Sequence, residues 1–566
     1  MADVSEPPVQ FDIFSGAPSR SGGVAEAVSA LAEAPAGERG AVHTRPVVAE
    51  FVLDLAGYRE GAPLHALRLL EPSFGDGVFL HEAARRLVTS WGQAGRPGGA
   101  ESLTSAITAV EVHRTTFEST RDRLADVLTA SGLTLEEARH LCDAWLVCDD
   151  FLLAPLSGPF DAVVGNPPYV RHDAIPPALL KRYRRDYATV YDRADLYVPF
   201  IQRGVDLLRD GGRLSYICAD RWMKNKYGGP LRRFLAARTG LLHVVGMHGA
   251  DAFEDDVDAY PSVFTVERGA GPVPTSTATS PEVSAPALAR LARQLEDGTS
   301  DPVQGVMSGD DPWLFRNTSV LRAFEASMPT LEDAGCRVGI GVATGADRVF
   351  IADADALDIE PDRVLPLAMA KDVRPDGSVE WSGKALANPF DEDGALVDLA
   401  QSPRLAAYFE RHGEALRRRY VARKSPERWY KTIDKVTVAL ASTPKLLIPD
   451  IKGQAVVGYD PGTLYPHHNL YVVTSETWDL RALQAVLRSR VAEYQVESYA
   501  VKMRGGYLRF QAQYLRRIRL PFWRDVPPVV RSRLREAAVE PRQACDEAAQ
   551  DLYGLDATAW AQIVSA

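Results

Sequence analysis

The chain has 566 residues, of which 46% are hydrophobic and 25% charged, a composition that excludes wholesale disorder. Its five cysteines form no C-x-x-C pair, so neither a disulfide framework nor a cysteine zinc site is expected. The formal net charge of −11 does not exclude a nucleic-acid partner, because such binding depends on local charge. The sequence has no apolar run of membrane-spanning length and no signal-peptide pattern, so we expect a cytoplasmic protein.

Composition and patterning divide the chain into four parts. Residues 1–40 are rich in Ala, Gly, Ser, Pro and Glu, which predicts a mobile N-terminal tail. Residues 41–267 alternate short β-rich segments with helical ones, which predicts an α/β domain with a mostly parallel seven-stranded sheet and helices on both faces. The Pro-, Ser- and Thr-rich residues 268–312 are interpreted as a linker or insertion. Residues 313–566 lack this alternation and predict an α+β domain with C-terminal helices.

In chain order, the strands expected in the first domain are 66–71, 106–111, 145–148, 160–164, 213–218, 241–246 and 261–267. The helices expected there are 46–56, 78–90, 114–129, 135–143, 195–209 and 229–238. A short helix is expected at 286–296, and further helices near 528–551 and 556–565.

Acidic residues and glycines follow the first three expected strands. The first strand runs into the turn EPSFGDG at 71–77, a strand–turn–helix arrangement that lets a ligand approach backbone amides. Glu111 ends the second strand, where a carboxylate can accept hydrogen bonds from a ribose. Asp150 and Phe151 follow the third, where they can bind an adenine amine and stack on its ring. No phosphate loop or three-glycine fingerprint is present, which favours an adenosine ligand without pyrophosphate, such as S-adenosylmethionine.

The fourth expected strand is followed by Asn166, Pro167, Pro168 and Tyr169. The two prolines make a stiff loop that presents the Asn166 side-chain oxygen and the Pro167 carbonyl as acceptors, with Tyr169 as a stacking surface. Two acceptors on the N–H groups of a planar aromatic amine favour a more tetrahedral nitrogen, whose lone pair can attack a methyl group. A base inside a duplex must be flipped out to reach such a loop.

The motifs EPSFGDGVF, AVEVH, CDDFLL and VVGNPPYVR, in this order, resemble those of γ-class DNA adenine-N6 methyltransferases. The later segments RADLY and GGRL resemble the Eco57I/TaqI-like branch of restriction-modification methylases. The resemblance implies a Rossmann-like fold, a C-terminal target-recognition domain, and S-adenosyl-L-methionine bound by Thr44, Glu71, Pro72, Gly75, Gly77, Glu111, Asp150 and Phe151. It also implies that the target base is held by Asn166, Pro167, Pro168 and Tyr169, with Tyr227 as a second stacking face.

Positive charge gathers at two places in the second half. Residues 416–431 hold seven Lys or Arg against one Glu, and residues 500–524 hold seven and no acid. Both clusters interleave aromatic residues, a pattern typical of nucleic-acid contact. The segments 339–345, 444–450 and 502–510 resemble parts of the recognition domains of this branch. The candidate DNA contacts are Arg418, Lys502, Arg504, Gly505, Gly506, Tyr507 and Arg509.

These features predict an enzyme that methylates N6 of a flipped adenine in double-stranded DNA, in restriction–modification or phage defence. We expect no nuclease activity in the chain itself, and a separate restriction or defence protein as a partner. Two alternatives stay open: methylation of RNA or of a protein glutamine, which pose the same chemical problem, and a non-catalytic DNA specificity subunit. The histidines, including His467 and His468, show no metal-ligand spacing, so no metal is expected.

Overall fold

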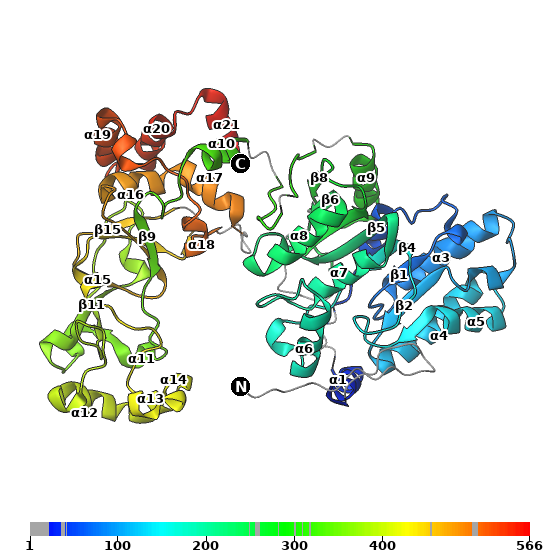
Figure 1. The fold of residues 1–566 in the computed structure, drawn as a ribbon, viewed down its shortest axis with the longest axis horizontal. Helices are drawn as coiled ribbons and strands as arrows, with labels where there is room; N and C mark the ends of the chain where they lie inside the picture. Colours follow the sequence, from blue (N-terminus) through cyan, green and yellow to red (C-terminus); the bar gives the residue numbers. More distant parts are fainter. Residues whose placement is uncertain are drawn as a thin grey trace, which may run out of the picture. The chain divides into compact units, whose positions relative to one another are not determined.

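The computed structural model describes residues 22–35, 40, 42–247, 250–254, 261–280, 282–298, 302–307, 309–315, 319–452, 455–500 and 508–565. The chain forms two compact units, residues 1–315 and 316–566, and each is described by itself (Figure 1). Within the described ranges, no helix is long and apolar enough to cross a membrane. All five cysteines are free thiols.

The first unit is built on an eight-stranded sheet with strand order β3-β2-β1-β4-β5-β7-β6-β8. Its strands are β1 (Leu69–Glu71), β2 (Ile107–Glu111), β3 (Leu146–Cys148), β4 (Phe160–Gly165), β5 (Leu208–Ala219), β6 (Thr239–Gly246), β7 (Pro261–Arg268) and β8 (Ser276–Thr279). Only β7 runs antiparallel to its neighbours, so the sheet is mostly parallel, as predicted. The seven predicted strands are confirmed, and β8 adds an eighth at the edge.

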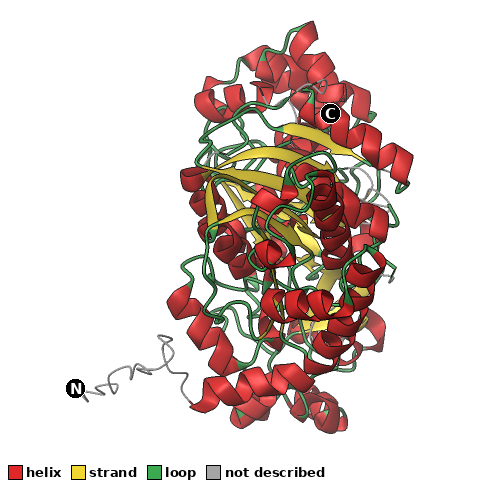
Figure 2. Ribbon diagram, turned by 90° about the vertical axis from the view of Figure 1, so that its right-hand side faces the viewer, coloured by secondary structure: helices red, strands yellow, loops and turns green. Residues whose placement is uncertain are grey.

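Helices cover both faces of this sheet, as Figure 2 shows with helices in red and strands in yellow. The predicted helices are confirmed as α2 (Pro46–Leu55), α3 (Val78–Gln93), α4 (Arg114–Ala130), α5 (Leu135–Trp145), α7 (Tyr197–Asp206), α8 (Gly229–Arg238) and α9 (Ala285–Glu296). The structure adds α1 (Gly22–Glu33) and α6 (Pro177–Asp186), which were not predicted.

The sheet separates two hydrophobic cores. Because side chains alternate along a strand, Leu69 of β1 enters one core and Leu70 the other. In β4, Ala162 and Val164 likewise face away from Val163. One core packs against α2, α3, α4, α5 and α9, and the other against α1, α6, α7 and α8. This double covering explains why the strands are apolar on both faces.

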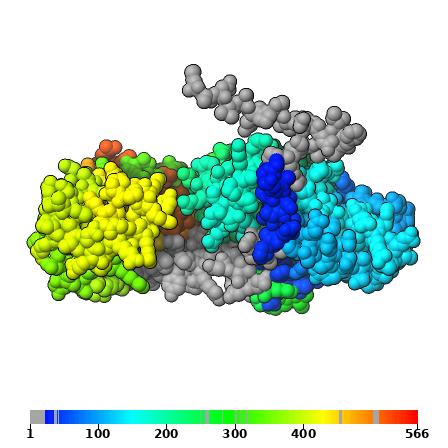
Figure 3. Space-filling model, turned by 90° about the horizontal axis from the view of Figure 1, so that it is seen from below, coloured from blue at the N-terminus to red at the C-terminus, as the bar shows by residue number. Residues whose placement is uncertain are grey.

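The structure differs from the predicted tail and the predicted linker. Within residues 1–40, α1 buries Val24 and Val28, which lie one helical turn apart, and it packs against α4 and α6. Figure 3 shows α1, in dark blue, lying on the surface of the first unit. Within residues 268–312, β8 pairs with β6 and α9 buries Leu288 and Leu295. Composition concealed the docking of α1 and of β8, because a few apolar residues at the right spacing suffice for docking. The helix α9 was predicted.

The second unit contains two four-stranded sheets, β10-β12-β11-β16 and β15-β13-β17-β9, and a two-stranded pair, β14-β18. The strands are β9 (Cys336–Ile340), β10 (Ile351–Asp353), β11 (Val364–Ala368), β12 (Lys384–Ala387), β13 (Lys445–Pro449), β14 (Ile451–Lys452), β15 (Gly458–Asp460), β16 (Tyr465–Pro466), β17 (Leu470–Ser475) and β18 (Leu508–Arg509). The helices are α10 (Ser319–Ser327), α11 (Asp347–Phe350), α12 (Pro403–Arg411), α13 (Gly413–Arg417), α14 (Tyr420–Lys424), α15 (Ala439–Ser442), α16 (Leu480–Arg488), α17 (Arg490–Tyr499), α18 (Ala512–Leu515), α19 (Pro528–Ala537), α20 (Arg542–Tyr553) and α21 (Ala557–Ser565).

A buried ion pair joins two strands of the second unit. Lys445 at the start of β13 faces Asp460 at the end of β15, with 2.6 Å between Nζ and Oδ2 and both side chains buried. Burial lowers the pKa of the Lys445 ammonium. Two backbone carbonyls, of Ala441 and Thr443, accept its remaining hydrogen bonds, so the buried charge is compensated within the fold.

The turn between β1 and α3 depends on its glycines. Gly75 and Gly77 have φ angles of +50° and +83°, in the left-handed region that favours glycine. A Cβ atom at Gly77 would lie 2.6 Å from Thr120 Cγ2 and 2.8 Å from the His81 ring, whereas one at Gly75 would meet nothing within 4 Å.

We therefore expect Gly77→Ala to lower the free energy of unfolding by about 2–4 kcal/mol, because left-handed strain adds to a steric clash. Gly75→Ala is the matched control and should cost only the strain, about 1–2 kcal/mol. Urea unfolding of both variants measures the difference. Equal losses for the two variants would show that the packing around Gly77 is not a constraint.

Candidate functional site

The candidate site lies where the strand order of the first sheet reverses. The chain places β2 and β3 on one side of β1, and β4 and β5 on the other. In such sheets a crevice forms outside the carboxyl ends of the strands at the reversal point. A cavity of about 210 Å³ opens there, and residues following all four strands β1 to β4 line it.

The cavity brings together most of the residues that the sequence predicted. It is lined by Thr44, Pro72, Gly75, Glu111, Asp150, Phe151, Asn166 and Pro168. The other residues predicted to bind the cofactor or the target base do not line it; they are Glu71, Gly77, Pro167, Tyr169 and Tyr227. Residues that the sequence analysis missed also line it, among them Leu31 and Gly40 from the predicted tail, Tyr183 of α6 and Phe200 of α7. Of these four residues, only Leu31 had a signal in the sequence, because Val24, Val28 and Leu31 are spaced like one face of a helix.

Glu111 holds the glycine turn in place. Its Oε2 accepts a hydrogen bond from the Gly75 backbone N–H at 3.0 Å, and its Oε1 accepts one from the His113 N–H at 2.8 Å. Glu111 therefore fixes the turn and faces the cavity at the same time.

Asp150 is held by two neighbours at the end of β3. Its Oδ1 accepts from the Leu152 N–H at 2.9 Å, and its Oδ2 accepts from the Tyr183 hydroxyl at 2.6 Å. The next residue, Phe151, packs on Phe200 with ring centroids 4.9 Å apart. These contacts place a carboxylate beside a flat apolar wall at one end of the cavity.

Glu71 is a buried acid at the end of β1. Its side chain is fully buried, and neither carboxylate oxygen has a hydrogen-bond partner in the described part of the chain. Burial, and secondarily the nearby Glu111 carboxylate, raise the pKa of Glu71 well above its ordinary value. An unpaired buried carboxyl of this kind is costly when ionised and is typical of a functional site.

The loop after β4 fixes the orientation of the Asn166 side chain. Its Nδ2 donates to the Val42 carbonyl and to Thr44 Oγ1, both at 3.1 Å. Because a carbonyl can only accept, the group that faces Val42 must be the NH₂ group. The Oδ1 atom is then left as a buried acceptor with no partner among the described residues.

Tyr169 lies within an aromatic cluster. Its ring centroid is 6.2 Å from Phe253 and 6.4 Å from Tyr197, and the Tyr197 hydroxyl is hydrogen-bonded to that of Tyr227 at 2.6 Å. Burial raises the pKa of the Tyr169 hydroxyl well above its ordinary value. The predicted stacking residues Tyr169 and Tyr227 are thus connected through Tyr197.

The first basic cluster, residues 416–431, is only partly available for a partner. Arg418 is exposed and paired with Glu414, one turn earlier in the chain. Arg419 instead donates to the Thr344 and Trp429 carbonyls, and Arg417 stacks on Trp429 at 3.9 Å, so both support the fold. Of the second cluster, Lys502, Arg504, Gly505, Gly506 and Tyr507 lie outside the described residues, as does the side chain of Arg509.

Two family descriptions match the sequence. Residues 111–253 match the Eco57I restriction-modification methylase family, and residues 410–520 match the TaqI-like C-terminal specificity domain. The type II methyltransferase M.PaeR7I of Pseudomonas aeruginosa is 52% identical over 530 residues, which cover 91% of this chain and 92% of that protein. M.XhoI of Xanthomonas vasicola is 49% identical over 534 residues, covering 92% and 98%.

Among solved structures, the type IIL restriction-modification enzyme MmeI in complex with DNA is similar with a TM-score of 0.59 at 12% identity, covering 92% of this chain and 74% of that one. The first unit has the predicted Rossmann-like fold, with a mostly parallel sheet whose strand order reverses beside β1. The chain belongs to the type II methyltransferases of restriction–modification, in the Eco57I-like branch with a TaqI-like specificity domain. This confirms the resemblance found in the motifs.

The raised pKa of Glu71 predicts a pH-dependent cost to stability. In the folded state the carboxyl retains a proton that the unfolded chain releases near pH 4.3, so stability falls as pH rises until the folded-state pKa is passed. Glu71→Gln lacks this effect. Its free energy of unfolding should therefore rise relative to the unaltered protein as the pH increases above about 4.3, by up to about 1.4 kcal/mol per pH unit, until the folded-state pKa of Glu71 is passed.

Chemical unfolding across this pH range measures the difference. Glu118→Gln, at an exposed position on α4, is the matched control. A constant offset between Glu71→Gln and the unaltered protein would contradict the raised pKa.

Proposed function

We propose that this chain transfers a methyl group from S-adenosylmethionine to N6 of an adenine flipped out of double-stranded DNA. The observation that carries this proposal is the unpaired, buried Oδ1 of Asn166, which lies in a residue that lines the cavity. An acceptor without a donor at this position fits an exocyclic amine, which brings two N–H groups. The adjacent Pro167 has no N–H of its own, and its carbonyl is the second acceptor of the proposal.

The acidic and aromatic residues that line the cavity fit S-adenosylmethionine. Glu111 would accept the ribose hydroxyls, and Asp150 with Phe151 would bind the adenine amine and ring. Glu71, Gly75, Gly77 and Thr44 would surround the methionine part, where a cationic ammonium would offset the buried Glu71 carboxyl. When bound, this cofactor supplies an electrophilic methyl group on a sulfonium.

The residues of the chain act by position and by electrostatics. Asn166 Oδ1 and the Pro167 carbonyl would accept the two amine hydrogens and favour a tetrahedral nitrogen. The nitrogen lone pair would then take the methyl group as the bond between that group and sulfur breaks, and the methylated amine would release one proton to solvent. Tyr169 and Tyr227 provide flat surfaces for the extruded base. The amide cannot swing away, because Val42 and Thr44 hold its NH₂ group.

Double-stranded DNA is the proposed substrate because of the second unit. It carries the TaqI-like specificity domain and exposed cations such as Arg418 and Arg423. The relatives named type II methyltransferases support a role in restriction–modification or phage defence, with a separate restriction or defence protein as the partner. In this proposal the chain modifies DNA without cutting it. A direct assay distinguishes this proposal from the two alternatives. These are methylation of RNA or of a protein glutamine, and a specificity subunit without catalytic activity.

The direct test is transfer of tritiated methyl groups from S-adenosylmethionine to duplex DNA, to RNA and to protein, followed by nucleoside analysis. We expect N6-methyladenine in DNA alone. Asn166→Ala should lower the turnover by about 10²-fold or more while calorimetry shows cofactor binding retained, because the lost acceptor acts on the target amine. Methylation of another acceptor, or full activity in Asn166→Ala, would refute the proposal.

Thr44 provides a second test, because its hydroxyl holds the Asn166 amide. Thr44→Val removes one of the two acceptors that fix the NH₂ group of Asn166. The loss of this hydrogen bond should raise the activation free energy by about 1–1.5 kcal/mol, so turnover at saturating cofactor should fall about tenfold. Thr44→Ser keeps the hydroxyl and should restore turnover. If Thr44→Val weakens cofactor binding and leaves turnover at saturation unchanged, Thr44 serves the cofactor and not the amide.

A further inference from the structure

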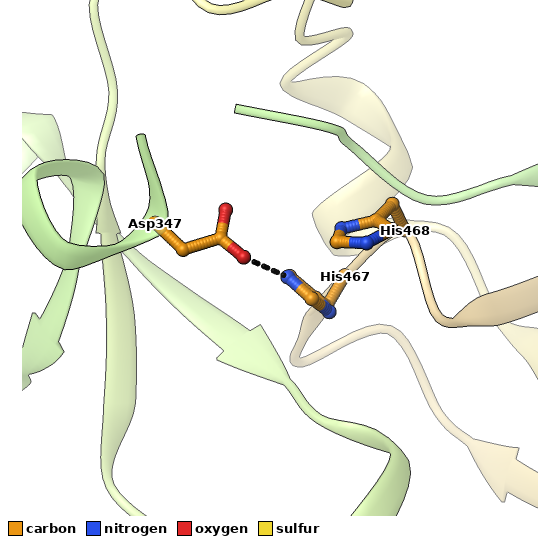
Figure 4. Close-up of side chains that lie close together, drawn as sticks. All are labelled: Asp347, His467 and His468. Carbon is orange, nitrogen blue, oxygen red and sulfur yellow. Dashed lines mark hydrogen bonds and ion pairs between the residues drawn. The ribbon is translucent and has the colours of Figure 1, made fainter. Parts of the chain in front are cut away.

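The second unit brings three metal-ligating side chains together, Asp347, His467 and His468 (Figure 4). One potential ligand atom from each lies within 4.8 Å of the other two. Asp347 Oδ2 and His467 Nε2 are 3.3 Å apart, and the imidazole rings of His467 and His468 have centroids 4.1 Å apart. Asp347 is 120 residues away from the histidines in the chain, so no local spacing could have predicted the cluster.

The backbone fixes the segments that carry these residues. Val342, in the turn that links β9 to α11, pairs with His467 in the loop that links β16 to β17. The His468 N–H donates to the Val342 carbonyl at 3.1 Å, and the His467 N–H donates to Ala368 at the end of β11 at 3.0 Å. A Cβ atom at Gly341 would lie 2.2 Å from the His467 carbonyl oxygen, so glycine is required for this close approach.

Asp347 and His467 form a fixed pair, and His468 is accessible to solvent. His467 is buried, and the Thr344 hydroxyl donates to Asp347 Oδ1, which leaves Oδ2 facing His467. Hydrogen bonds of this kind orient the ligands of metal sites. His468 is exposed, so its ring can turn toward an ion at little cost, and the ion can enter from solvent.

We propose that Asp347, His467 and His468 bind a divalent transition-metal ion of the Zn²⁺ class. Bond lengths of 2.0–2.2 Å place two tetrahedral ligands about 3.3 Å apart, and this matches the Asp347–His467 pair. Two imidazoles and one carboxylate suit Zn²⁺, Co²⁺ or Ni²⁺, whereas Mg²⁺ and Ca²⁺ prefer oxygen ligands. Water fills the remaining coordination positions.

The ion joins two segments that are distant in sequence. It ties the turn carrying Asp347 to the loop carrying both histidines, beside the segment 339–345 that resembles recognition domains of this family. Because binding requires the folded arrangement, the ion stabilises the folded state of the second unit. The proposal holds whichever base the enzyme methylates.

The test uses the full chain, purified without a histidine tag and stripped of metal. Calorimetric titration with Zn²⁺ should show one saturable site, Co²⁺ should give the absorption spectrum of a nitrogen- and oxygen-ligated ion, and Zn²⁺ should raise the Tm. Mg²⁺ should produce none of these changes. No saturable Zn²⁺ binding, or binding matched by Mg²⁺, would overturn the proposal.

Single substitutions then locate the site. Asp347→Asn and His468→Ala should each weaken Zn²⁺ affinity at least about tenfold, because each removes one ligand. His412→Gln is the matched control, since His412 is the remaining histidine of this unit and stacks on Tyr408 instead. Circular dichroism confirms that each variant is folded. Affinity that is unchanged in both ligand variants, or lost in His412→Gln, would place the ion elsewhere and refute the assignment.

Discussion

The hydrogen bond from the Asn166 amide to the Val42 carbonyl is the contact on which the candidate site depends. It decides which end of the amide faces the cavity, and so whether the loop after β4 offers an acceptor or a donor. The reversal of strand order gathers Glu111, Asp150 and Asn166 at one edge of the sheet. That convergence alone would leave the Asn166 amide free to turn. The direction of this proposed catalytic group comes from a segment outside the sheet.

This segment precedes the first strand and is anchored from several sides. The His43 carbonyl accepts from the Glu254 N–H and the Arg45 N–H donates to the Ala252 carbonyl, while the Tyr169 N–H donates to the Gly40 carbonyl. The same part of the chain contributes Leu31 of α1 to the cavity wall. The N-terminal region is therefore part of the site, although its composition had suggested a tail.

The sequence predicted the first sheet well because its strands are apolar runs separated by amphipathic helices, and strand ends place their residues at a common edge. Glu111, Asp150 and Asn166 were predicted to lie together on this ground, and all three line the cavity. The docking of α1 and β8 was missed because it depends on a few apolar side chains in segments rich in Ala, Gly, Ser, Thr and Pro. The structural role of Arg419 was missed for a different reason, since a sequence does not show which cations donate to distant carbonyls. The cluster of Asp347 with two histidines likewise exists only through the fold.

One of the two groups that orient Asn166, the carbonyl of Val42, belongs to the main chain, and every residue type at position 42 would bring the same carbonyl. A substitution at position 42 therefore cannot remove this hydrogen-bond acceptor. The chemistry is protected by the path of the polypeptide, and it is exposed to insertions or deletions that would shift this stretch out of register. Selection should consequently act more strongly on the number of residues in the region before the first strand than on the residue type at position 42.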